Sequence, residues 1–210
     1  MSSPPPVALL DYGVGNLHSA SKALARAGAD VRVVPTVAAA SGTAGLVVPG
    51  VGAYGACLAG LGTAGGPAAV AGWLATGRPL LGICVGMQLL FQASQEGPVD
   101  GGVGALAGTV ARLGGNGDRI KVPHIGWDEV SVEAGSRLLA GLPSGTRFYF
   151  VHSYAPPAGG PATAARCDYG GGFAAAVEQG NLFGTQFHPE KSGAAGLRLL
   201  GNFVAACANA

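Results

Sequence analysis

The sequence predicts an α/β fold: a single domain with a central, mostly parallel sheet, helices on both faces and an antiparallel extension. Strand-like apolar runs alternate with helical stretches through the first half of the chain. Such alternation is typical of parallel sheets covered on both faces. The second half contains strand-like segments joined by turns, with little helix between them. The length of 210 residues fits one domain with a single core.

The first half supplies the parallel sheet and its helices. Apolar runs predict the strands, and apolar residues at helical spacing predict the helices, as Leu17, Ala20 and Leu24 do for the first one. In chain order, the predicted elements are strand 7–13, helix 16–29, strands 31–34 and 45–50, a helical pair over 53–77, strand 78–84 and a helix from about Gly86 to Gln95.

The second half supplies the antiparallel extension and a closing helix. Its strand-like segments are 104–113, 127–132, 146–154 and 173–187, and an apolar stripe predicts a helix over about 194–207. Residues 1–6 are expected to be a disordered lead-in, because three successive prolines cannot join a helix or a central strand. The domain is therefore expected to span 7–210.

Composition argues against several classes of protein. The 12 basic and 11 acidic residues are well mixed, so no basic run is available for nucleic acid. No window approaches the roughly 18 apolar residues of a membrane helix, and residues 1–6 do not resemble a secretion signal. The four cysteines are far apart and form neither a disulfide framework nor a CxxC metal pair. These features favour a reducing cytoplasm.

Cys84 is the candidate nucleophile. An apolar strand runs directly into a predicted helix at this residue, and Gly82 and Gly86 flank it. This G-x-nucleophile-x-G pattern predicts a strained strand-to-helix turn that projects the side chain from the sheet edge. The backbone N–H of Val85 is then placed to donate to an oxyanion. The alternative is a buried core cysteine between two packing glycines.

His188 and Glu190 are the candidate base and its orienting carboxylate. In extended chain, residues two apart face the same side, so both side chains can point at one site. Pro189 cannot continue a central strand, which places the pair at a strand end, where open α/β sheets keep their active sites. His188 would transfer the proton and Glu190 would fix the tautomer of the imidazole. A structural or surface histidine is the alternative.

Gly50 and Gly52 mark a candidate oxyanion segment between a strand and a helix. Glycine leaves the backbone bare, so its N–H groups can approach a substrate oxygen. An ordinary glycine-rich turn is the alternative reading. A phosphate loop is excluded, because no G-K-[ST] follows.

Together, PGVG at 49–52, GICVGMQ at 82–88 and FHPE at 187–190 resemble the triad-type, class I glutamine amidotransferases, which have a flavodoxin-like fold. The resemblance runs over essentially the whole chain from Val7. Four further segments resemble the histidine-pathway branch, the glutaminase subunits of imidazole glycerol phosphate synthase: DYGVGN at 11–16, KVPHIGW at 121–127, VHSY at 151–154 and FHPEKS at 187–192.

The resemblance implies a role for each matching residue and no metal or organic cofactor. Cys84 would form a glutamyl thioester, with His188 and Glu190 completing the triad. The implied oxyanion donors are Val51, Gly52 and Val85. The implied glutamine-binding residues are Gly52, Gln88, Glu96, His152, Ser153 and Tyr154.

The resemblance also implies a heterodimer. The ammonia would pass to a (β/α)8-barrel cyclase subunit that forms imidazole glycerol phosphate and aminoimidazole carboxamide ribotide in histidine biosynthesis. Glutaminase activity would stay weak until that partner binds its ribotide substrate. The residues implied at the partner interface are Asn16, Pro123, His124, Gly126, Trp127 and Lys191. One departure is Asp128, which stands where the family more often has asparagine.

Several rival functions remain open on the sequence. Anthranilate- and GMP-type glutaminases usually carry histidine where this chain has Met87. The vitamin B6-pathway glutaminase has a different oxyanion segment, and a cytidine-triphosphate-type enzyme would need a long synthetase domain. A cysteine peptidase would share the same chemistry. A non-catalytic regulatory subunit is disfavoured by the intact set of Cys84, His188 and Glu190.

Overall fold

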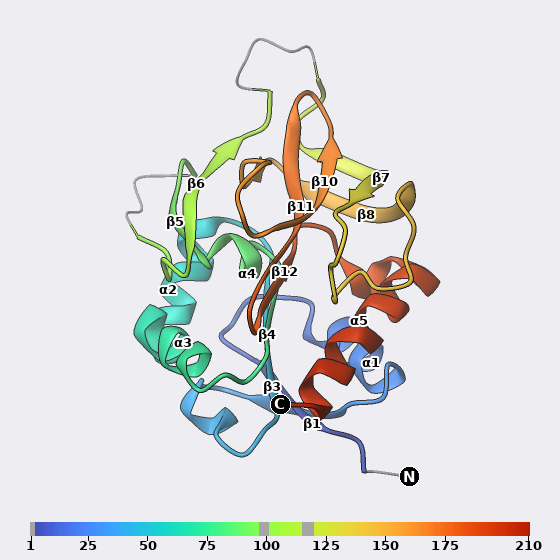
Figure 1. Cartoon of the computed structure of the whole chain (residues 1–210). Coiled ribbons are helices and arrows are strands. Elements are labelled where there is room, and N and C mark those ends of the chain that lie inside the picture. Colours follow the sequence, from blue (N-terminus) through green and yellow to red (C-terminus); the bar gives the residue numbers. More distant parts are fainter. Residues whose placement is uncertain (1–2, 97–100, 115–119) are drawn as a thin grey trace.

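The computed structural model describes residues 3–96, 101–114 and 120–210, and its architecture confirms the predicted α/β fold (Figure 1). Within these residues, a nine-stranded sheet runs in the order β2-β1-β3-β4-β12-β11-β10-β7-β8. The strands from β2 to β12 in this order are parallel, and those from β12 to β8 are antiparallel. Over these ranges, the sheet therefore contains four parallel and four antiparallel strand pairs.

The parallel half brings three strand ends together at one edge. Its strands are β1 (Pro6–Leu10), β2 (Asp30–Val34), β3 (Gly45–Gly50), β4 (Leu80–Cys84) and β12 (Leu182–Thr185). The central strands β3, β4 and β12 are buried throughout, as apolar strands covered on both faces must be. The register pairs Gly50 with Cys84 and Thr185 with Ile83. The candidate nucleophile thus lies between the oxyanion segment and the chain that leads to His188.

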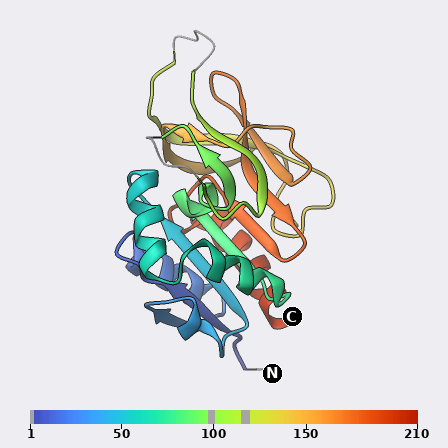
Figure 2. The same ribbon diagram turned by 90° about the vertical axis from the view of Figure 1, so that its left-hand side faces the viewer.

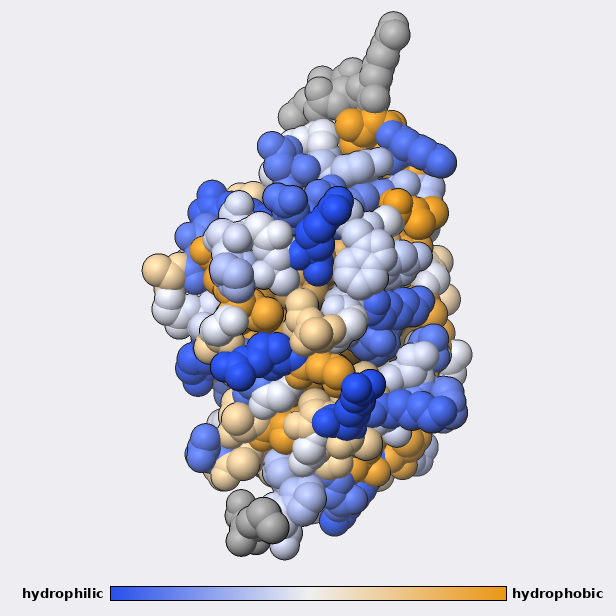
Figure 3. Space-filling view, turned by 90° about the vertical axis from the view of Figure 1, so that its right-hand side faces the viewer, coloured by the Kyte–Doolittle hydropathy of each residue, from blue (hydrophilic) through white to orange (hydrophobic). Residues whose placement is uncertain are grey.

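Helices cover both faces of the parallel half (Figures 1 and 2). Helices α1 (Leu17–Arg26) and α5 (Gly193–Ala208) lie on one face, and α2 (Tyr54–Thr63) and α3 (Gly66–Ala75) lie on the other. The short elements are η1 (Ala38–Ala40), α4 (Val85–Gln88) and η2 (Pro189–Lys191). On the face that carries α1 and α5, hydrophobic residues are scattered among hydrophilic ones (Figure 3).

The antiparallel half and a small second sheet complete the domain. The antiparallel strands are β7 (His124–Val132), β8 (Thr146–His152), β10 (Thr163–Asp168) and β11 (Gly172–Gln179). The second sheet contains β5 (Phe91–Ser94), β6 (Leu106–Arg112) and β9 (Tyr154–Ala155).

Several predicted boundaries were wrong. The helix expected from Gly86 to Gln95 ends at Gln88, and Phe91–Ser94 is strand β5 instead, because it pairs with β6. The segment 104–113 forms β6 in the second sheet rather than part of the main extension. Strand β10 was not predicted at all. The first strand begins at Pro6, one residue inside the expected lead-in, and residues 1–2 of that lead-in lie outside the described residues.

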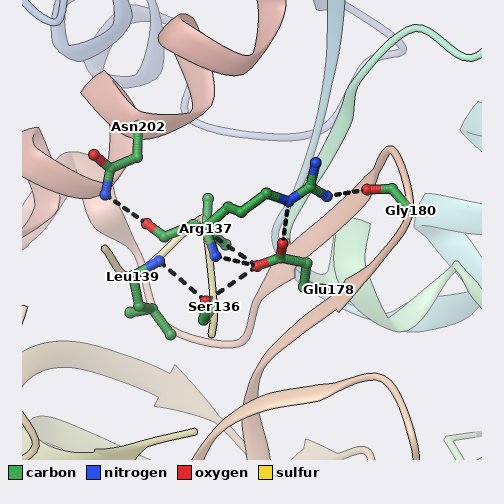
Figure 4. A network of polar contacts seen from close by, with 7 residues as sticks. Ser136, Arg137, Leu139, Glu178, Gly180 and Asn202 are labelled. Carbon is green, nitrogen blue, oxygen red and sulfur yellow. Dashed lines mark hydrogen bonds and ion pairs between the residues drawn. The ribbon is translucent and has the colours of Figure 1, made fainter. Parts of the chain in front are cut away.

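The loop between β7 and β8 is anchored by Glu178 on β11 (Figure 4). Its carboxylate accepts hydrogen bonds from Ser136 Oγ at 3.0 Å, from the backbone N–H groups of Arg137 and Leu138 at 3.0 and 3.1 Å, and from Arg137 Nε at 2.6 Å. Asn202 on α5 donates to the carbonyl of Leu138 at 3.0 Å. The loop is thereby tied to both the sheet and α5.

Among residues 3–96, 101–114 and 120–210, no single helix is long and apolar enough to cross a membrane. Only α2 and α3 taken together meet such a criterion, and they are bent by 74° relative to each other.

Candidate active site

Cys84 sits on the strained turn that the sequence predicts. It ends β4, begins α4 and has φ 55°, which makes it the sole non-glycine residue with positive φ in the described part of the chain. A Cβ at Gly86 would lie 1.9 Å from the carbonyl oxygen of Val48, and one at Gly82 would lie 2.7 Å from the carbonyl oxygen of Gly86. Only glycine therefore allows α4 to pack this closely against β3 and β4.

His188 and Glu190 meet, but not in the extended chain that the prediction assumed. His188 precedes η2, and Glu190 lies within that short helical turn. His188 Nδ1 lies 2.8 Å from Glu190 Oε1, so the carboxylate accepts the Nδ1 proton. A hydrogen bond stabilises this turn, because the Ser192 hydroxyl donates to the carbonyl of His188 at 2.7 Å. A Cβ at Gly196 would lie only 1.9 Å from the Pro189 carbonyl oxygen, so α5 packs directly on the turn.

The charge of His188 depends on its two neighbours. Burial lowers the pKa of His188, but interactions with Cys84 and Glu190 outweigh that effect and raise it to about 9. Its Nε2 atom is buried and has no hydrogen-bond partner among the described residues. Gln186 Nε2 donates to Cys84 Sγ at 3.6 Å. The imidazole thus faces the sulfur with a nitrogen free to exchange a proton with it.

A cavity of about 490 Å³ opens onto Cys84 and His188. Glu190 does not line it and reaches it only through His188. Every residue predicted to bind glutamine or to stabilise the oxyanion borders this cavity. Its lining is Asn16, Val51, Gly52, Cys84, Val85, Gln88, Glu96, Pro123, Val151, His152, Ser153, Tyr154, His188 and Lys191.

Two buried side chains that the prediction missed hold the oxyanion segment from behind. The Tyr12 hydroxyl donates to the carbonyl of Pro49, and the Cys57 thiol donates to the carbonyl of Val51 at 3.4 Å. Burial raises the pKa of Tyr12 and raises that of Cys57 to about 11, so both keep their protons. The sequence offered no signal for the role of Cys57.

The floor of the cavity is a network of amides. Gln88 Nε2 donates to the carbonyl of Tyr154 at 2.8 Å and to Gln186 Oε1 at 3.0 Å. This fixes the amide so that Gln88 Oε1 is left buried without a partner among the described residues. Glu96 Oε2 accepts from the backbone N–H of Tyr54 at 3.1 Å. Gln186 was missed because no sequence pattern separates it from a core residue.

The predicted interface residues divide into three groups. Asn16, Pro123 and Lys191 border the cavity. Trp127 is 48% exposed, so it is not a core aromatic. Gly126 precedes it on β7.

The prediction that His124 lies at the partner interface is corrected by its burial. The residue is only 2% exposed, because its ring stacks between Phe150 and Tyr169, so it cannot form a surface contact.

An imidazole–carboxylate pair beside a cysteine elbow, on the carboxyl edge of an α/β sheet, defines an enzyme class that transfers acyl groups through a thioester. The model of the family described as "Glutamine amidotransferase class-I" matches residues 8–207. The chain therefore belongs to the class-I glutamine amidotransferase family.

The named relatives of this chain belong to one branch of that family. The imidazole glycerol phosphate synthase subunit HisH of Nocardia farcinica is 54% identical, covering 94% of this chain and 96% of its own length. The HisH subunit of Streptomyces avermitilis is 46% identical, covering 97% and 98% respectively. Among solved structures, PurLQS from Thermotoga maritima aligns with a TM-score of 0.74 at 20% identity, covering 96% of this chain and 98% of that one. This last likeness concerns the fold alone.

Proposed function

We propose that this chain is the glutaminase subunit of an imidazole glycerol phosphate synthase. It hydrolyses glutamine to glutamate and ammonia through Cys84, His188 and Glu190. The observation that carries the proposal is the 2.8 Å contact of Glu190 with a His188 imidazole that borders the same cavity as the Cys84 sulfur. The names of the relatives, HisH subunits at 46–54% identity, support the assignment to histidine biosynthesis.

The reaction proceeds in two halves. Cys84 Sγ bonds to the side-chain carbonyl carbon of glutamine, while His188 Nε2 holds the proton that the thiol has given up. The tetrahedral oxyanion accepts hydrogen bonds from backbone N–H groups of Val51, Gly52 and Val85. The C–N bond then breaks, and the His188 proton passes to the leaving nitrogen as ammonia forms. Water attacks the thioester with the same imidazole as base, which releases glutamate and restores the thiol.

Glutamine is held by its α-amino and α-carboxylate groups at the far end of the cavity. Gln88 Oε1 is an acceptor without a partner among the described residues, which suits an ammonium group. Glu96 also lines the cavity and adds a negative charge. The segment His152-Ser153-Tyr154 lines it as well, with the Tyr154 carbonyl accepting from Gln88 Nε2.

The ammonia passes to a (β/α)8-barrel cyclase subunit in a heterodimer, and the ring-forming lyase step belongs to that partner. The interface surrounds the cavity mouth at Asn16, Pro123 and Lys191 and extends to Gly126 and the exposed Trp127. His124 is left out of this interface. The four free cysteines are compatible with the proposed cytoplasmic location.

The test combines the chain with the barrel cyclase and follows product formation from either glutamine or ammonium salt. Cys84→Ala should abolish the use of glutamine and leave the use of ammonium unchanged. Loss of both activities, or of neither, would contradict the proposal. Glutamine turnover by the isolated chain at the rate of the complex would contradict activation by the partner.

A further inference from the structure

Two buried histidines form a polar chain behind the cavity wall. His124 on β7 and His152 on β8 are paired in register, and His124 Nδ1 lies 3.2 Å from His152 Nε2. At one end, His124 Nε2 lies 3.4 Å from Asp128 Oδ2. At the other end, His152 Nδ1 lies 2.9 Å from the carbonyl oxygen of Tyr154. The chain thus has three contacts and ends on an acceptor at each side.

The number of protons does not match the number of contacts. A carboxylate and a carbonyl can only accept, so each contact needs a proton from an imidazole. Two neutral imidazoles supply one N–H each. The Tyr154 carbonyl requires His152 Nδ1–H, and His152 Nε2 then requires His124 Nδ1–H. His124 Nε2 is left as a lone pair facing the Asp128 carboxylate, and the chain is one proton short.

We propose that His124 and Asp128 are positioning residues for the glutamine cavity, and that the Asp128–His124–His152 chain is completed by one additional proton shared between His124 Nε2 and Asp128. The link to the cavity is the Tyr154 carbonyl, which also accepts from Gln88 Nε2 at 2.8 Å. His152 itself borders the cavity. A complete chain fixes the His152 ring and, through Tyr154, the amide of Gln88.

The neighbouring groups place the proton on the His124–Asp128 pair. Burial lowers the pKa of His152 to about 3, and the nearby His124 and His188 act in the same direction, so His152 stays neutral. Burial also lowers the pKa of His124, and Asp128 opposes that effect.

The groups that face this pair from the adjoining strand β10 do not supply the proton. Burial raises the pKa of Cys167 to about 12, and the nearby Asp128 and Asp168 raise it further. The ring of Tyr169 stacks on His124 and directs its hydroxyl away, to the Lys121 carbonyl.

The additional proton on the His124–Asp128 pair depends on pH. Because the pKa of His124 is lowered from its ordinary value, the additional proton binds only in acidic solution and is absent at neutral and higher pH. In Asp128→Asn, the amide oxygen can keep the contact that Asp128 Oδ1 makes with the N–H of Glu129 at 2.8 Å. Its Nδ2 then takes the place of Oδ2 and donates to His124 Nε2. This variant completes the chain at every pH without the additional proton.

The first test does not depend on the proposed function. Nitrogen NMR of the full chain with labelled histidine follows His124 between about pH 8 and about pH 5. We expect His124 Nε2 to gain a proton on acidification in the wild type and no such gain in Asp128→Asn. The matched control is Asp168→Asn, an exposed carboxylate on β10, which should behave as wild type. Absence of uptake in the wild type, or equal uptake in Asp128→Asn, overturns the proposal.

The second test rests on the proposed glutaminase function and uses the complex with the cyclase. At about pH 8, Asp128→Asn should lower the KM for glutamine about threefold relative to wild type, as expected for one restored hydrogen bond, and the gain should vanish at about pH 5.5. The value of kcat should change less. Equal KM values at both pH values, with activity intact, overturn the positioning role. Loss of the triad function would instead abolish activity in all variants, and the NMR result would stand.

Discussion

Two largely buried carboxylates, Glu178 and Glu190, are used in opposite ways. Glu178 lies on the regular strand β11 and accepts from four donors, the last of them a charged guanidinium (Figure 4). Glu190 lies on a helical turn and has one partner, His188 Nδ1, while its Oε2 is buried with no partner in the described part of the chain. The side chains are 12% and 4% exposed, so burial alone does not distinguish them.

The difference lies in whether hydrogen-bonding capacity is used up. A carboxylate saturated by donors anchors the backbone and has nothing left to offer a substrate. Among the described residues, four buried side-chain polar atoms lack a partner, and three of these belong to His188, Glu190 and Gln88. Unmet hydrogen-bonding capacity is therefore found at Gln88 and His188, which line the cavity, and at Glu190 behind His188.

The substitution with the largest expected effect is His188→Asn, which tests the role of the Nε2 atom. The shorter amide can still donate to Glu190 from near the position of Nδ1, but it has no atom in place of Nε2. We expect kcat for glutamine to fall by about 10⁴-fold or more, as in triads that lose one member. Urea unfolding should show a much smaller change. A variant that keeps more than a tenth of the activity would contradict the role of His188.

Gly86→Ala tests the packing that creates the elbow. The new Cβ would lie 1.9 Å from the carbonyl oxygen of Val48, so backbone must move. We expect a loss of about 3 kcal/mol or more in the free energy of unfolding, together with loss of activity. The control is Gly201→Ala on α5, where the Cβ meets nothing within 4 Å. That change should stabilise the protein by about 0.5–1 kcal/mol and leave activity unchanged.

Glu178→Gln tests the anchoring carboxylate. Loss of the charge weakens several hydrogen bonds to the loop, so the free energy of unfolding should fall by about 1–3 kcal/mol. Glutamine hydrolysis at a temperature where the variant is folded should stay within about twofold of wild type. A large fall in kcat without unfolding would show that the two carboxylates are not separated in role.

The last prediction concerns the pH dependence of stability. The pKa of His188 is raised in the folded protein from 6.5 to about 9, so the folded state binds this proton more tightly than the unfolded chain does. The resulting stabilisation is fully present below about pH 6.5 and is lost as the pH rises through about 9. Urea unfolding across this range should show a steeper decline for wild type than for His188→Asn. Parallel curves would show that the imidazole is not held by Cys84 and Glu190.

Local patterns predicted the parts of the site that local geometry builds. The elbow at Cys84 needs a strand, a turn and two glycines that are adjacent in sequence, and the structure has all of them. The meeting of His188 with Glu190 was also predicted, although the backbone between them is a helical turn rather than a strand. The prediction that the helix continues beyond Gln88 was wrong, because Phe91–Ser94 forms a strand that is hydrogen-bonded to β6. That pairing partner is not visible in the local sequence.

The class of chemistry can be predicted from the chain alone, because the candidate nucleophile, the candidate base and the glycine-rich segments each occupy a short stretch of sequence. The groups that surround them are known only from the folded structure. Gln186 beside the sulfur, Tyr12 behind the oxyanion segment and His124 buried against His152 all depend on contacts between residues that are 28 or more positions apart in the chain. Such contacts follow from sheet register and close packing, which no periodicity in the sequence records.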